Sequence, residues 1–162
     1  MSGLKPNSFR YEVVQTLARP ALKAVRSASA SLDIGRTIMI YSPDTRSYLT
    51  DIPHRREYDI WRARITDLEY SAIMAALNER IEGDEIVTSS WIPGSDWTGT
   101  VYEPIYEKAC RMNEDHAAKF FGLLLWEVVL NHEDVWSFGR YQKDGLQIEG
   151  MTYFKLTTPP QP

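Results

Sequence analysis

The segment from Glu114 to His132 constrains the fold most, because it predicts a helix that is apolar on two sides. One wide face carries Phe121, Leu124, Leu125 and Val128 at helical spacing. The opposite side carries a second apolar stripe, formed by Leu123, Trp126 and Leu130. A helix with two apolar faces has to be covered on both. Either a second layer of this chain covers the stripe, or another copy or a partner does, which makes the stripe a candidate homodimer interface.

The apolar character of this segment does not predict a membrane span. Its longest apolar run, from Phe120 to Leu130, is interrupted by Gly122 and Glu127. Crossing a bilayer takes about 20 apolar residues, so we expect a buried helix and no contact with a membrane. No secretory signal is recognisable, and a single cysteine, Cys110, cannot close a disulfide within the chain. We therefore expect a protein of the reducing cytoplasm.

Strand signals around this helix predict an α+β fold. Six β-rich segments stand out, at 37–41, 47–52, 58–65, 85–92, 135–141 and 146–157. The last two are joined through Asp144-Gly145, a pair that suits a two-residue hairpin turn. Short connections of this kind indicate a mostly antiparallel sheet of about six strands, with helices packed on one face.

Helix boundaries are marked by capping residues. Thr66 and Glu69 form a capping box that opens a helix ending near Gly83. Pro104 opens a second helix, which runs to about Met112, and Asn113 caps the apolar helix. An N-terminal helical segment is expected at 9–30, with a break at Pro20. Because no linker is recognisable, residues 1–162 are expected to form a single domain with frayed tails at 1–7 and 158–162.

Residues 89–100 form the first candidate site, because they place two tryptophans, two glycines and several hydroxyl groups between a strand and a helix. Such loops often bind ligands. The candidate ligand-binding residues are Trp91, Asp96, Trp97, Thr98 and Thr100. Asp96 suits a base, a metal ligand or an anchor for a sugar or an amine; alternatively, it orders a tight turn while Trp97 covers the core. The lysine and glycine spacing of nucleotide-binding loops is missing, so no cofactor is predicted.

Asp96, Glu127 and His116 are the candidate catalytic residues. A carboxylic acid buried in an apolar run acquires a raised pKa and can serve as an acid or a base, unless it is paired with an arginine from the first half of the chain. His116 lies on the same helix face as Glu127, but three turns away, about 16 Å. These two side chains therefore do not form one site. The histidines lack the spacing of metal ligands, so no metal site is predicted.

Charge is unevenly distributed along the chain. Residues 1–66 hold 11 Lys and Arg against 6 Asp and Glu, whereas residues 67–162 hold 7 against 16. Segments of opposite charge pair when they fold together, although a basic segment also suits nucleic acid. The concentrated basic footprint of a dedicated DNA-binding domain is absent, so nucleic acid is an unlikely partner.

Three classes of function follow. The first is a binding or assembly protein, homodimeric through Leu123, Trp126 and Leu130. The second is a small enzyme or small-molecule binder with its pocket at the loop Ser95–Thr100. The third is nucleic-acid binding through residues 1–66.

Overall fold

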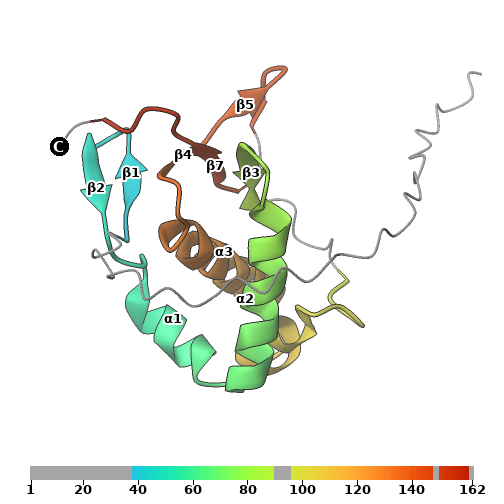
Figure 1. The fold of residues 1–162 in the computed structure, drawn as a ribbon. Helices are drawn as coiled ribbons and strands as arrows, with labels where there is room; N and C mark the ends of the chain where they lie inside the picture. Colours follow the sequence, from blue (N-terminus) through green and yellow to red (C-terminus); the bar gives the residue numbers. More distant parts are fainter. Residues whose placement is uncertain (1–37, 90–95, 148–149, 161–162) are drawn as a thin grey trace, which may run out of the picture. The chain divides into compact units, whose positions relative to one another are not determined.

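The computed structural model describes residues 38–89, 96–147 and 150–160, which belong to one compact unit, Gly35–Pro162. The helix expected at 9–30 and the candidate ligand-binding residue Trp91 lie outside the described residues. The elements in chain order are β1 Ile40–Ser42, β2 Ser47–Leu49, α1 Arg55–Arg62, α2 Asp67–Ile81, β3 Ile86–Thr88, the π-helix η2 Ile105–Ala109, α3 Glu114–Leu130, β4 Trp136–Gly139, β5 Gln142–Lys143, β6 Leu146–Gln147 and β7 Thr152–Lys155. The predicted α+β class is confirmed (Figure 1).

The main sheet is mixed and has five strands, in the order β2-β1-β4-β7-β3. β1 pairs in parallel with β4, while β1–β2, β4–β7 and β3–β7 are antiparallel. The prediction of a mostly antiparallel sheet of about six strands is therefore wrong. A parallel pair needs a long crossover, and here the crossover contains all the helices of the described residues, which lie on one side of the sheet (Figure 1).

The segment 58–65, predicted as a strand, is instead the end of α1 and the turn after it. Its buried residues are Tyr58, Trp61 and Ile65, which are spaced i, i+3 and i+7. That spacing places them on one side of a helix, whereas Ile60 remains 45% exposed. Burial in the core thus follows the helical period, and the strand expected at 58–65 does not form.

The capped helices begin where the sequence predicts. The Thr66 side chain accepts a hydrogen bond from the Glu69 amide at 3.2 Å, and the Glu69 carboxylate accepts one from the Thr66 amide at 2.9 Å. The Asn113 side chain accepts from the His116 amide at 2.9 Å at the start of α3. The helix expected after Pro104 is shorter, since it forms only the single π-helical turn η2.

The predicted C-terminal hairpin is split into two parts. Asp144 and Gly145 both have positive φ, 54° and 78°, as a hairpin turn of this kind requires. They join β5 and β6, which form a separate two-stranded ribbon. β4 and β7 pair with each other within the main sheet.

The apolar stripe of α3 is covered within this chain. Leu123, Trp126 and Leu130 are each only 4–6% exposed. The indole of Trp126 meets the rings of Phe138 and Tyr153 at centroid distances of 4.7 and 6.2 Å, and its N–H donates to the Asp51 carbonyl at 3.2 Å. α3 is therefore the central layer between the sheet and the other helices. None of the helices in the described ranges has the length and apolarity that a membrane crossing requires.

Candidate functional site

The outer face of the sheet is the surface that the described helices leave uncovered. Since Trp126 on α3 contacts Phe138 and Tyr153, those two side chains point toward the helices. Strand residues alternate between the two faces, so the register assigns the opposite face to their neighbours. The outer face then consists of Tyr41, Tyr48, Ile86, Thr88, Ser137, Gly139, Thr152 and Phe154.

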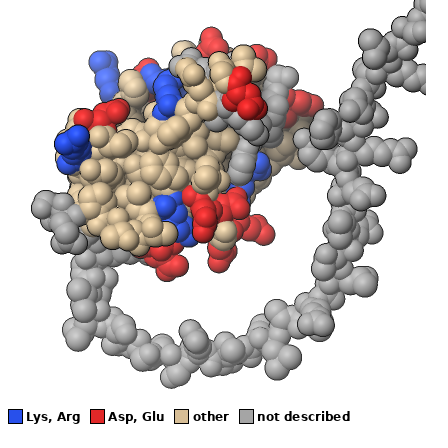
Figure 2. All heavy atoms as spheres, turned by 90° about the horizontal axis from the view of Figure 1, so that it is seen from above, with Lys and Arg blue, Asp and Glu red and all other residues tan. Residues whose placement is uncertain are grey.

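This outer face is uncharged and rich in aromatic rings. Antiparallel sheets that have one face in water usually carry polar residues on it, but here Tyr41 and Tyr48 form an edge-to-face pair at 5.3 Å. Tyr141, which follows β4, lies edge-on to Phe154 at 5.9 Å. Seen from the side away from the helices, the surface has a continuous uncharged area with most charged side chains around it (Figure 2).

A groove of about 410 Å³ lies at the β7–β3 end of this face. It is lined by Ile86, Tyr141, Thr152 and Phe154, and Ile86 is 61% exposed there. Thr152 is only 7% exposed, and its hydroxyl oxygen has no hydrogen-bond partner within the described part of the chain. The hydroxyl oxygen is itself inaccessible to solvent, so the surface of the groove is almost entirely apolar.

Gly139 allows this arrangement on β4. A Cβ atom built at that position would lie 2.9 Å from the ring of Tyr141. Tyr141 therefore lies close against the strand only because residue 139 has no side chain. A second hollow of about 420 Å³ borders the same ring and includes Asp44 and Arg140, one charge of each sign.

The loop at 96–100 is held by its own hydrogen bonds. The Asp96 carboxylate accepts from the Thr98 amide at 3.0 Å, and that bond lowers the pKa of the carboxyl group. The Thr100 hydroxyl donates to the Trp97 carbonyl at 2.8 Å and accepts from the Tyr102 amide at 3.2 Å. Trp97 is buried, stacked on Tyr106. These polar groups organise a turn, which is the structural alternative that the sequence left open.

We expect Asp96→Ala to lower the thermal unfolding midpoint, because it removes the acceptor of the turn, whereas Asp96→Asn keeps an oxygen acceptor and retains most of the stability. Since the pKa of Asp96 is lowered in the folded chain, its contribution is present above the unfolded pKa of about 3.9 and is lost at lower pH. Thermal melts of both variants at pH 7 and pH 3 measure this. A midpoint that Asp96→Ala leaves unchanged at pH 7 would return Asp96 to the ligand-binding hypothesis.

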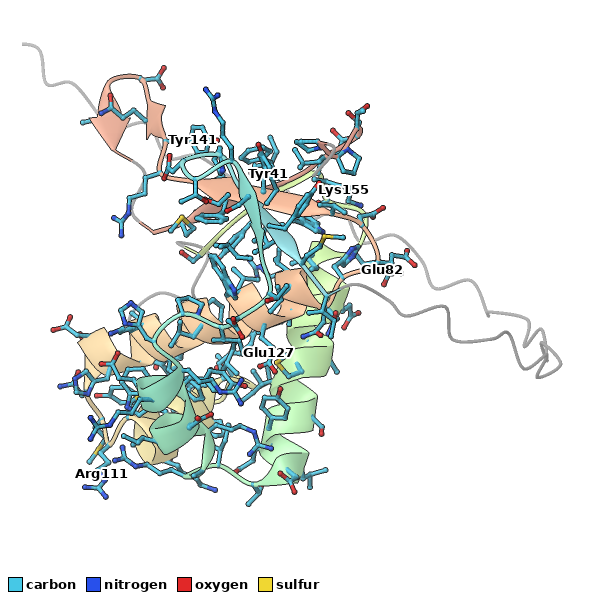
Figure 3. All side chains as sticks on the ribbon, turned by 90° about the vertical axis from the view of Figure 1, so that its left-hand side faces the viewer. Tyr41, Glu82, Arg111, Glu127, Tyr141 and Lys155 are labelled. Carbon is cyan, nitrogen blue, oxygen red and sulfur yellow. The ribbon has the colours of Figure 1, made fainter. Side chains whose placement is uncertain are left out.

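Glu127 lies in a half-buried cluster of hydroxyl groups between α1, α2 and α3 (Figure 3). Its carboxylate accepts a short hydrogen bond from the Tyr58 hydroxyl, and the Tyr70 hydroxyl interacts with both groups. Burial and the neighbouring carboxylate raise the pKa of Tyr58. The partner of Glu127 among the described residues is therefore Tyr58 and not an arginine. Arg62 from the first half of the chain lies instead over the Tyr70 ring, 4.0 Å from its centroid.

The remaining candidate residues are not assembled into a site. The ring of His116 packs on Trp61, with centroids 5.5 Å apart, and takes no part in the Glu127 cluster. Within residues 38–89, 96–147 and 150–160, no three His, Cys, Asp or Glu side chains are grouped as a metal ion would need. Burial raises the pKa of the Cys110 thiol to about 12, which keeps it in its unreactive form.

Part of the predicted basic segment is also used within the fold. Arg55 pairs with Asp59 at 2.9 Å, Arg62 pairs with Asp67 at 2.5 Å, and Arg64 donates to the Ala109 carbonyl at 2.7 Å. Nucleic-acid binding stays an untested prediction.

Comparisons with protein-family models, with curated proteins and with solved structures find no match for this chain. The site is therefore assigned from its own geometry. The outer face of the sheet was not predicted from the sequence, although one signal was present: Tyr41, Tyr48 and Phe154 lie in β-rich segments at positions where a solvated strand would carry polar residues.

Proposed function

We propose that this protein is a non-catalytic binding or assembly protein that works as a homodimer, with the outer face of its sheet as the contact surface. The observation that carries this proposal is the uncharged, aromatic face made by alternate residues of all five strands. Two sheets that pack face to face bury such positions in a common core. The homodimer predicted from the sequence is thus retained, while its contact moves from the stripe on α3 to the sheet.

A second copy is the occupant that the charges favour. The whole chain has a formal charge of −4, so two copies repel each other over most of their surfaces. The outer face carries no charged residue, and on this face two identical surfaces meet without repulsion. The nearby hollow is lined by both Asp44 and Arg140. In a two-fold dimer, Asp44 of one copy can lie opposite Arg140 of the other at the rim of the contact.

An enzymatic role has less support. Asp96 is exposed and engaged in a turn, and Glu127 is engaged with Tyr58. Neither carboxylate lines the two hollows described above. For this reason we place binding before catalysis.

The test is the oligomeric state of three proteins, measured by sedimentation and native mass spectrometry over a range of concentrations. We expect the wild-type chain to dimerise and Tyr41→Asp to raise the dimer dissociation constant at least tenfold, since it places a charge within the uncharged face. The matched control is Leu68→Asp, the same kind of change at a side chain that is 82% exposed in the first turn of α2. We expect this control to dimerise like the wild type.

A monomeric wild-type protein would overturn the proposal, and so would a dimer that Tyr41→Asp leaves intact. Hydroxyl-radical labelling of the wild type provides a readout that needs no variant. We expect Tyr41 to be protected at high concentration and labelled after dilution. Protection that does not depend on concentration would mean that the face is covered within one chain.

A further inference from the structure

The β5–β6 ribbon is a second element that the described chain leaves without support. It rises from the sheet on the side away from the helices (Figures 1 and 3). β5 and β6 pair with each other and belong to a sheet of their own. A two-stranded hairpin alone is at best marginally stable in water. Even so, this ribbon carries a large apolar side chain, Leu146, which is 76% exposed.

The ribbon and the groove have complementary chemistry. Leu146 is an apolar side chain without a cover, and the groove at Ile86 and Phe154 is an apolar hollow without an occupant among the described residues.

The length of the ribbon fits the distance between two packed sheets. Three residues, 142–144, lead from Tyr141 at the sheet to the turn at Gly145. At about 3.3 Å per residue, the ribbon reaches about 10 Å beyond Tyr141. Sheets that pack face to face lie about 10 Å apart. The tip of the ribbon can therefore reach the sheet surface of a copy packed on the outer face.

We infer that the β5–β6 ribbon of each copy inserts into the groove of the other, with Leu146 seated among Ile86, Tyr141 and Phe154. The occupant is a second copy because one chain carries both the projecting side chain and the hollow, which is what a two-fold contact requires. This inference rests on the proposed homodimer and adds the β5–β6 ribbon as an element that stabilises it. It also gives a reason why Leu146 and the apolar groove are both exposed to solvent in a single chain.

The first test introduces a charge at the tip of the ribbon. We expect Leu146→Asp to raise the dimer dissociation constant at least tenfold, because an aspartate cannot enter an apolar groove without losing its hydration. Leu68→Asp again serves as the control for adding one negative charge at an exposed leucine.

The second test pairs two damaged copies. Ile86→Lys places a positive charge in the groove, so we expect this variant alone to dimerise poorly. Mixed with Leu146→Asp, it should form a one-to-one heterodimer, because one ribbon then meets its groove as an Asp–Lys pair and the other contact is wild-type. Native mass spectrometry distinguishes the two masses directly.

Two results overturn the inference in distinguishable ways. A wild-type dimer that Tyr41→Asp dissociates but Leu146→Asp does not would remove the ribbon and leave the proposed homodimer in place. A wild-type monomer would remove both. Absence of the heterodimer, when both single variants are folded and monomeric, would show that Leu146 and Ile86 do not meet across the interface.

Discussion

Trp126→Ala is expected to lower the free energy of unfolding by about 3–5 kcal/mol, the usual cost of removing a large aromatic side chain from a core. Trp126 joins α3 to the sheet through Phe138 and Tyr153 and is only 6% exposed. Its N–H also donates to the Asp51 carbonyl. Urea unfolding followed by far-UV circular dichroism measures the loss.

The control for Trp126 is a phenylalanine substitution. Trp126→Phe keeps much of the ring and removes the bond to Asp51, so a smaller loss of about 1 kcal/mol is expected. A Trp126→Ala protein as stable as the wild type, yet unable to dimerise, would contradict the buried position of this side chain. It would restore Leu123, Trp126 and Leu130 as the homodimer interface considered from the sequence.

The sequence predicted those elements whose signals are local. The Thr66–Glu69 capping box and Asn113 set the starts of α2 and α3 through contacts within three residues. The turn at Asp144-Gly145 was predictable for the same reason, since both residues tolerate positive φ. The segment 58–65 was ambiguous because its apolar residues fit a strand and a helix alike, and only packing against Phe120 decides between them.

The pairing of strands that are distant along the chain could not be predicted from the sequence. The Ser137 hydroxyl bonds to the Tyr41 carbonyl across the parallel β1–β4 pair, at a sequence separation of 96. No local pattern specifies that pair, and without it the strand order is undetermined. The outer face depends on the same register, so it could not be assembled from the sequence. Loop residues around Asp96 were singled out for their chemistry, but their hydrogen bonds within the turn depend on backbone geometry.

Tyr58→Phe is the second substitution for which we expect a large effect, a loss of about 1–3 kcal/mol in the free energy of unfolding. It removes the hydroxyl that donates to the half-buried Glu127 carboxylate, which then keeps only its interaction with the Tyr70 hydroxyl. Glu127→Gln keeps an oxygen that can accept from Tyr58 and removes the charge, so a smaller loss is expected. Urea unfolding at pH 7 compares the two variants.

The pH dependence provides an independent check on this cluster. The pKa of Tyr58 is raised in the folded chain, chiefly by burial and also by Glu127, so the neutral phenol is favoured by folding. Its contribution is complete below the unfolded tyrosine pKa of about 10 and is lost as the pH rises above that value, because the unfolded chain then releases the proton and the folded chain does not. Burial also raises the pKa of Tyr153, so the wild type should lose stability steeply above pH 10. Tyr58→Phe should show a shallower slope there, since one of the titrating groups is gone. A slope equal to that of the wild type would mean that Tyr58 ionises as readily in the folded chain as in the unfolded one, and that Glu127 does not depend on its hydroxyl.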